Sequence, residues 1–250
     1  MGAGLTDGNR GLRSAAADAA LGALRLKRRA ARASALARLS MLAKAKGSSI
    51  DLDVAGDLEV GKDVRFWVEP GTRNVLRIGP GVQLLDRVLV HLKGGTVELG
   101  EGVQVRRDTV LNVSGRFVCE GHNIISYANL VHCAEEIVLE QYASTNEFVS
   151  IIDSTHHHDG ERPFFYENMT SAPIRIGANA WICNKASVLM GVHVGANSVV
   201  ASHSVVNKDV PEATVVGGVP ARVVAERKVG EAARALADGQ RRSGLRAIAP

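Results

Sequence analysis

The sequence has few aromatic residues and no long apolar run. Phe, Tyr and Trp make up only 4% of its 250 residues, so a core cannot depend on large rings. The chain has instead 31 Val and 11 Ile, which favours many short strands. No stretch approaches the roughly 18 apolar residues of a membrane-spanning helix, and the N-terminus lacks the pattern of a signal peptide. We therefore expect a cytoplasmic protein.

Cysteine is scarce as well. Cys119, Cys133 and Cys183 are odd in number, far apart and in no Cys-x-x-Cys pair. This pattern argues against a disulfide framework and against a zinc site. We expect three small buried side chains and no metal requirement.

Acidic residues are nearly absent from residues 1–50, which hold two of them against ten Lys and Arg. Residues 15–45 are rich in Ala, Leu, Arg and Lys and contain no proline, which predicts a helix. Two roles fit it equally: a cap on the end of the main domain, or peripheral contact with an anionic inner membrane surface. We expect no nucleic-acid partner. The basic residues that would meet a membrane are Arg25, Lys27, Arg28, Arg29, Arg32 and Arg38.

A six-residue repeat begins near Leu52. Its clearest run is Ile176, Ile182, Val188, Val194, Val200 and Val206. A unit this short predicts a parallel β-helix of about nine coils, with an inward aliphatic ladder, whereas a β-sandwich would show a period of two. The register slips near 91–98 and 119–138, which we interpret as bulges or short loops.

One segment breaks the repeat. Residues 153–173 are polar at first and then aromatic, and they contain three of the eight histidines. Such an excursion predicts a protruding loop with a function. The chain is thus divided into a basic helical extension over 1–50, a β-helix domain over 51–211, and a C-terminal segment over 212–250 with a short helix and a flexible tail.

Four C-terminal segments are distinctive: Ile176-Gly-Ala-Asn-Ala-Trp-Ile, Gly191-Val-His-Val-Gly-Ala-Asn-Ser-Val-Val, Ser204-Val-Val-Asn-Lys-Asp-Val-Pro and Gly217-Gly-Val-Pro-Ala-Arg-Val-Val. They resemble the repeats of the hexapeptide-repeat acyltransferases, most closely the maltose and galactoside O-acetyltransferase type. The resemblance is strong over 135–225, weaker over 52–134 and absent over 1–50. It implies a mainly β fold, the left-handed parallel β-helix of triangular cross-section. It also implies a homotrimer, with acetyl-CoA or another acyl-CoA bound between neighbouring subunits.

The resemblance also implies site residues. The family's catalytic histidine, counted seventeen residues from Leu139, falls on His156, and Asp153 is its candidate orienting partner. A neutral imidazole can take the proton of an acceptor hydroxyl as that oxygen attacks a thioester. His157 and His158 follow directly, so a solvated histidine-rich loop and a metal cluster are the competing interpretations.

The expected cofactor and acceptor contacts are spread over the C-terminal repeats. Positions that contact CoA in the family fall on Asn184, Ser202, Asn207, Lys208 and Arg222. Acceptor contacts are expected at Ser126 and Trp181. The family's sugar-contacting Asn and Asp fall on Ser126 and Ala134, so the identity of the sugar does not transfer.

The sequence thus predicts an acyltransferase that moves an acetyl or other short acyl group from acyl-CoA to a hydroxyl of a sugar or glycoconjugate. Transfer to the amine of an amino sugar or antibiotic is the first alternative. A γ-type carbonic anhydrase, with three histidines from different coils around zinc, and a non-catalytic β-helix scaffold are the others.

Overall fold

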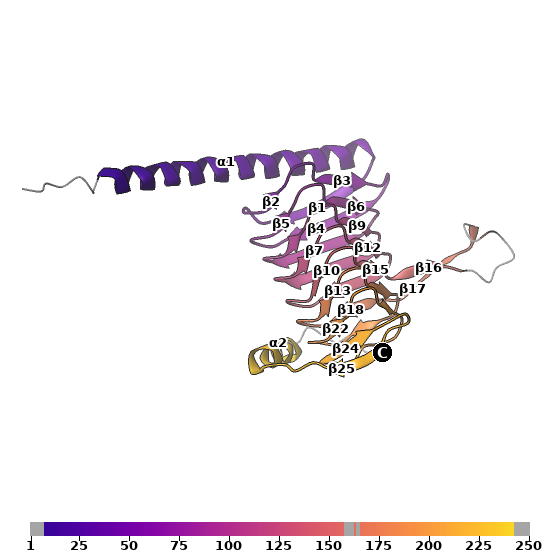
Figure 1. The fold of residues 1–250 in the computed structure, drawn as a ribbon. Coiled ribbons are helices and arrows are strands. Elements are labelled where there is room, and N and C mark those ends of the chain that lie inside the picture. The colour runs from indigo at the N-terminus through magenta and orange to yellow at the C-terminus, as the bar shows by residue number, and fades with distance from the viewer. Residues whose placement is uncertain (1–7, 158–162, 164–165, 243–250) are drawn as a thin grey trace, which may run out of the picture.

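The predicted parallel β-solenoid is confirmed. The structure is a computed structural model that describes residues 8–157, 163 and 166–242. Short strands follow the chain around three sheets in turn, so that each round of three strands forms one coil and successive coils stack along the long axis (Figure 1). The predicted flexible tail beyond residue 242 lies outside the described residues.

The three sheets are here called sheets A, B and C. Sheet A contains β1 (Ser49–Val54), β4 (Arg73–Ile78), β7 (Thr96–Glu101), β10 (Arg116–Gly121), β13 (Glu136–Leu139), β18 (Ile174–Ile176) and β21 (His193–Val194). Sheet B contains β2 (Glu59–Val60), β5 (Gln83–Leu84), β8 (Gln104–Val105), β11 (Ile124–Ile125), β14 (Ser144–Thr145), β19 (Trp181–Ile182), β22 (Val199–Val200), β24 (Thr214–Gly217) and β25 (Arg222–Glu226). Sheet C contains β3 (Arg65–Val68), β6 (Leu89–Leu92), β9 (Val110–Val113), β12 (Leu130–Cys133), β15 (Ser150–Ile152), β20 (Ser187–Leu189) and β23 (Val205–Val206).

The solenoid has about seven turns, fewer than the nine expected. A coil at the C-terminal end takes 18 residues, as the pairing of Arg175 with His193 shows. Coils in the middle take 20, because Thr96 pairs with Arg116 and Arg116 with Glu136. The extra residues lie in longer sheet A strands and in the corners that follow sheet C, which is why the six-residue register slips upstream.

The aliphatic ladder fills the interior. All six residues of the clearest run are at most 1% exposed, and Phe117 is the largest fully buried side chain. Adjacent coils approach closely at the corners after sheet A. A Cβ at Gly177 would lie 2.5 Å from the Ala196 nitrogen, which explains the glycine that follows Ile176 in the repeat. Cys119 and Cys133 are buried and unpaired, and burial raises the pKa of both thiols.

Helix α1 (Gly8–Ala45) caps the N-terminal end of the solenoid with its C-terminal part. Ala35, Leu39 and Ala43 are buried, and Arg32 Nη1 donates to the Ala55 carbonyl oxygen at 2.9 Å. The N-terminal part extends beyond the coils (Figure 1). At the opposite end, β25 pairs antiparallel with β24, and α2 (Glu231–Arg242) follows. Within the described residues, neither helix offers an apolar stretch sufficient to cross a membrane.

The outer face of sheet A is strongly charged. Arg116 contacts both Glu98 and Glu136, at 3.0 and 2.8 Å, and Arg175 contacts Glu140 at 2.6 Å. The Glu120 side chain, only 10% exposed, lies 3.9 Å from Arg175. Burial, and then the charge of Glu140, raise the pKa of Glu120, while Arg175 opposes the shift.

Replacing Glu120 with Gln is expected to stabilise the protein at neutral pH. A carboxyl group whose pKa is higher in the folded than in the unfolded chain binds protons on folding. Its contribution therefore becomes unfavourable as the pH rises above the ordinary value of 4.5. Urea unfolding should give the Glu120→Gln variant the higher midpoint at pH 7, and the difference should shrink toward about pH 4. A constant difference across that range would contradict this assignment.

Candidate active site

A two-stranded arm leaves the solenoid at the end of sheet C. Strand β16 (Ser154–His156) pairs antiparallel with β17 (Met169–Ser171), and the arm projects from the body (Figure 1). At the root of the arm, where it leaves the solenoid, the Ala172 N–H donates to the Asp153 carbonyl oxygen at 2.9 Å. The predicted protruding loop at 153–173 is thus an ordered β-ribbon where it leaves the coil.

Asp153 fixes the root of this arm. Its side chain is fully buried, and its two carboxylate oxygens accept hydrogen bonds from the Ala134 N–H at 2.7 Å and the Glu135 N–H at 2.8 Å. Both bonds reach back to the preceding coil rather than out along the arm. Asp153 therefore positions β16, and His156 with it, through the backbone.

Removing this carboxylate should destabilise the protein. Asp153→Ala leaves the Ala134 and Glu135 N–H groups without the carboxylate oxygens that accept their hydrogen bonds, which is expected to cost about 2–4 kcal/mol in the free energy of unfolding. Asp209→Ala is a suitable control, because Asp209 accepts one exposed bond, from the His193 N–H at 2.8 Å. It should cost less than about 1 kcal/mol in the same urea titration. Equal losses in the two variants would show that the two hydrogen bonds to the Asp153 carboxylate are not what holds the arm.

His156 is the last residue of β16, opposite Met169 in the ribbon, and its side chain is half-buried. The next residue, His157, continues the pairing with a backbone bond from its N–H to the Asn168 carbonyl oxygen at 3.0 Å. His158 lies outside the described residues. The ribbon therefore holds the backbone of His156 in a regular antiparallel pair.

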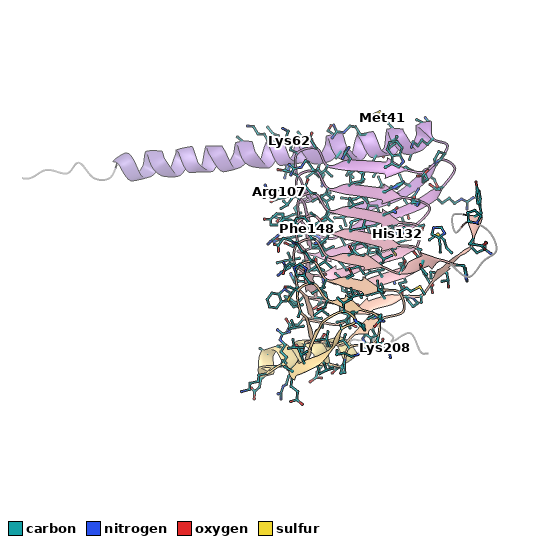
Figure 2. All side chains as sticks on the ribbon, turned by 45° about the vertical axis from the view of Figure 1, so that its right-hand side comes forward. Met41, Lys62, Arg107, His132, Phe148 and Lys208 are labelled. Atoms are coloured by element: carbon teal, nitrogen blue, oxygen red, sulfur yellow. The ribbon has the colours of Figure 1, made fainter. Side chains whose placement is uncertain are left out.

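A second histidine lies beside the root of the arm and was not anticipated from the sequence. His132 is on the outer face of β12, paired with Ile152, and its carbonyl oxygen accepts the Asp153 N–H at 3.2 Å. Burial, and then the charge of Lys93, lower the pKa of His132, while Asp153 opposes the shift. Figure 2 shows His132 on the side of the solenoid from which the arm projects. A neutral imidazole here can bind an acceptor hydroxyl.

Two of the predicted CoA contacts come together at the corner between sheets B and C. Ser202 donates its hydroxyl hydrogen to Asn184 Oδ1, and the His203 N–H donates to the Asn184 carbonyl oxygen at 3.1 Å. The two residues occupy the same corner in consecutive coils. Trp181, three residues before Asn184, lies on the outer face of sheet B and is 45% exposed. Its indole N–H donates to Asn146 Oδ1 at 3.0 Å.

The other predicted CoA contacts lie at the opposite edge of sheet C. Asn207 and Lys208 follow β23 directly, and the segment leading to Arg222 is held beside β23 by the Ala221 N–H, which donates to the Val205 carbonyl oxygen at 2.8 Å. Lys208 and Arg222 are exposed, and within the described residues neither makes an ion pair. Both cations are thus available to phosphate groups.

Two further residues have structural roles. Arg227, considered as a substitute phosphate ligand, instead donates from Nη1 to the carbonyl oxygens of Asn179 and Asn197, at 3.1 and 3.0 Å. It therefore ties the C-terminal hairpin to the solenoid. Ser126, a predicted acceptor contact, is only 3% exposed, and its hydroxyl donates to Glu147 Oε1 at 3.1 Å. Ser126 is therefore almost inaccessible to an acceptor molecule.

The predicted site residues therefore form two groups on one chain. Trp181, Asn184 and Ser202 lie at the B–C corner, whereas Lys208, like the arm with His156, lies on the far side of sheet C. At about 3.3 Å per residue when fully extended, the five residues from Ser202 to Asn207 span at most about 16 Å. Among the described residues no three His, Cys, Asp or Glu side chains are grouped closely enough to hold a metal ion.

The chain is similar in sequence to acetyltransferases. A protein of Mycobacterium tuberculosis named as an acetyltransferase is 26% identical over 220 residues, which cover 84% of this chain and 67% of the relative. Galactoside O-acetyltransferase of Escherichia coli is 47% identical over 58 residues, but these cover only 23% of this chain and 29% of the enzyme. No family model matches the chain.

Solved structures share the fold. The polySia-specific acetyltransferase NeuO superposes with a TM-score of 0.52 at 16% identity and covers 70% of this chain and 83% of its own. AntD, an N-acyltransferase from Bacillus cereus solved with dTDP and 3-hydroxybutyryl-CoA, superposes with a TM-score of 0.50 at 16% identity. That match covers 78% of this chain and 90% of AntD. In sequence and in fold, the chain is therefore a relative of the hexapeptide-repeat acyltransferases.

Proposed function

We propose that the protein transfers an acetyl or other short acyl group from acyl-CoA to a hydroxyl of a sugar or glycoconjugate. The observation that carries the proposal is His156, held on an ordered ribbon that leaves the solenoid, in a chain related to acetyltransferases over 220 residues. AntD was solved with an acyl-CoA and galactoside O-acetyltransferase is named for its sugar acceptor, which supports both substrates.

The chemistry needs one proton acceptor. His156 removes the hydroxyl proton while the acceptor oxygen attacks the thioester carbon, which forms the new carbon–oxygen bond. The tetrahedral intermediate then collapses, the carbon–sulfur bond breaks, and the CoA sulfur leaves with the proton that the imidazolium returns. The bonds and protons of this transfer balance without an oxidant or a metal. His132, next to the root of the arm, is positioned to bind the acceptor.

Lys208 and Arg222 are assigned to the phosphates of acyl-CoA, because each is an exposed cation without an ion-pair partner among the described residues. Lys208→Ala and Arg222→Ala are each expected to raise the KM for acyl-CoA about tenfold, the equivalent of about 1.4 kcal/mol, with kcat nearly unchanged. Lys62→Ala, at the other end of the solenoid (Figure 2), is the control and should leave KM unchanged. A fall in kcat alone would place these residues elsewhere in the reaction.

The active form is proposed to be a homotrimer in the cytoplasm. Its support is the separation of the two site groups on one chain, because a neighbouring subunit can bring the B–C corner of one chain to the arm of another. Lys27 and Arg29 of α1 are exposed, which supports additional peripheral contact with an anionic membrane surface.

The deciding experiment measures CoA release from acetyl-CoA with the purified protein against a panel of sugars, nucleotide sugars, amino sugars and aminoglycosides. Release with a hydroxyl acceptor, followed by identification of the ester, would establish the activity. Transfer to amines alone would replace it with N-acyl transfer. No release with any acceptor, despite binding of acetyl-CoA, would refute the proposed acceptors.

A further inference from the structure

A groove of about 770 Å³ lies between α1 and the sheet C strands of the first two coils. Leu39 and Leu42 line it from the helix, and Phe66, Trp67 and Leu89 line it from β3 and β6. Trp67 remains 50% exposed, although it is one of only two Trp in the chain. An apolar groove with a half-exposed indole is suited to binding an apolar ligand.

A row of paired residues on the outer face of sheet C runs from the groove to the candidate active site. Trp67 pairs with His91, His91 with Asn112, and Asn112 with His132. The next residue in this row is Ile152, beside the root of the arm. Four strand spacings of about 4.8 Å place the groove about 19 Å from that root.

The row between the two sites is polar. His91 Nε2 lies 2.8 Å from Glu69 Oε1, and His132 is half-buried. Asn112 Oδ1 is buried and, among the described residues, no donor lies within hydrogen-bond distance of it. An apolar groove thus leads into a row of hydrogen-bonding side chains that ends at the arm.

Cations border the groove. Lys46 Nζ lies 3.7 Å from the centroid of the Trp67 ring, and Arg38 and Arg65 are part of the lining. Both arginines are exposed, and neither has an ion-pair partner within the described part of the chain, although Asp63 also lines the groove. Two arginines on the lining of an apolar groove, without ion-pair partners among the described residues, are complementary to a phosphate attached to an apolar chain.

We propose that this groove binds the apolar chain of a lipid-carried acceptor. Its phosphate lies at Arg38 and Arg65, and its saccharide extends past Asn112 and His132 toward His156. This inference rests on the proposed function and names its acceptor class. Each methylene group buried in the groove should strengthen binding about fourfold.

The binding test uses the full chain with Trp181→Phe, so that Trp67 is the only Trp and reports on the groove. The probes are n-decyl phosphate below its micelle concentration, n-butyl phosphate and inorganic phosphate. Decyl phosphate should change the Trp67 emission with a Kd at least tenfold below that of butyl phosphate, and inorganic phosphate should cause no change.

Two leucines of one row provide the variant and its control. Leu89 lines the groove, and Leu130 lies two strands further along the same row of sheet C, outside it. Leu89→Gln should weaken decyl phosphate binding at least tenfold, whereas Leu130→Gln should change it less than twofold. Arg38→Gln combined with Arg65→Gln, both at the surface, should remove the preference for decyl phosphate over decyl maltoside without affecting the fold.

Several results would overturn the proposal. One is equal binding by the Leu89 and Leu130 variants. Another is binding to phosphatidylglycerol vesicles without binding to decyl phosphate, which would indicate a membrane surface rather than a groove. A third is an emission that changes with protein concentration alone, which would indicate that a second copy of the chain fills the groove.

An activity test separates this inference from the proposed function. For the acceptor sugar found by CoA release, carried at the end of an oligosaccharide long enough to span the roughly 19 Å between groove and arm, the decyl phosphate glycoside should have a KM at least tenfold below that of the methyl glycoside, with similar kcat. CoA release with equal KM for both would retain the function and refute the groove. Absence of release with every acceptor would refute the function, while the Trp67 titration would still decide what the groove binds.

Discussion

Replacing His156 with Ala is expected to lower kcat by about 10²–10⁴ while leaving the affinity for acyl-CoA nearly unchanged. The reason is that a general base acts on the acceptor in the transition state and makes no contact that holds the cofactor. Binding of acetyl-CoA by calorimetry, measured beside kcat, checks both halves of this expectation.

The neighbouring histidine is the control for this variant. His157 continues the ribbon through its backbone N–H, so His157→Ala should stay within about tenfold of wild type, a barrier change of about 1.4 kcal/mol. The same result is expected for His158→Ala, although His158 lies outside the described residues. A collapse of activity specific to either variant, with His156→Ala active, would move the base along the ribbon.

The fold could be predicted because its cause is local. Each coil buries its aliphatic residues against the coils above and below, so the inward positions repeat along the chain and can be counted. Val188 and Val194 are found where the count places them, fully buried. The number of coils could not be predicted, because two extra residues per coil extend strands and corners outward without disturbing the interior.

The candidate site was predictable only where sequence spacing determines position. His156 and Asn184 were assigned by counting along the segments that resemble the acyltransferase family, and these assignments remain predictions. His132 was not, because its place beside Asp153 depends on the pairing of β12 with β15, which brings together residues 21 apart in the chain. The two bonds from Arg227 to corner carbonyl oxygens likewise depend on how the terminal hairpin folds back, which no local pattern encodes.

Two inactive variants, mixed in one oligomer, are expected to recover activity. Chains with His156→Ala lack the base, and chains with Trp181→Ala lack the indole at the B–C corner. Each alone should lose activity at least about 10²-fold if both side chains act in one site. If the site is shared between neighbours, the Trp181 variant supplies His156 and the His156 variant supplies Trp181.

The amount recovered identifies the arrangement. In trimers co-assembled from equal amounts of the two variants, a complete site needs one chain of each kind in the correct order, so about a quarter of the sites should be intact. If His156 and Trp181 of the same chain formed the site, no mixture could contain an intact one, and activity would remain at the level of the single variants. The control combines trimers of each variant that were assembled separately and do not dissociate, and it should show no recovery. Full activity of Trp181→Ala on its own would remove Trp181 from the site. The mixing experiment would then use an Asn184 variant, because Asn184 lies at the same corner.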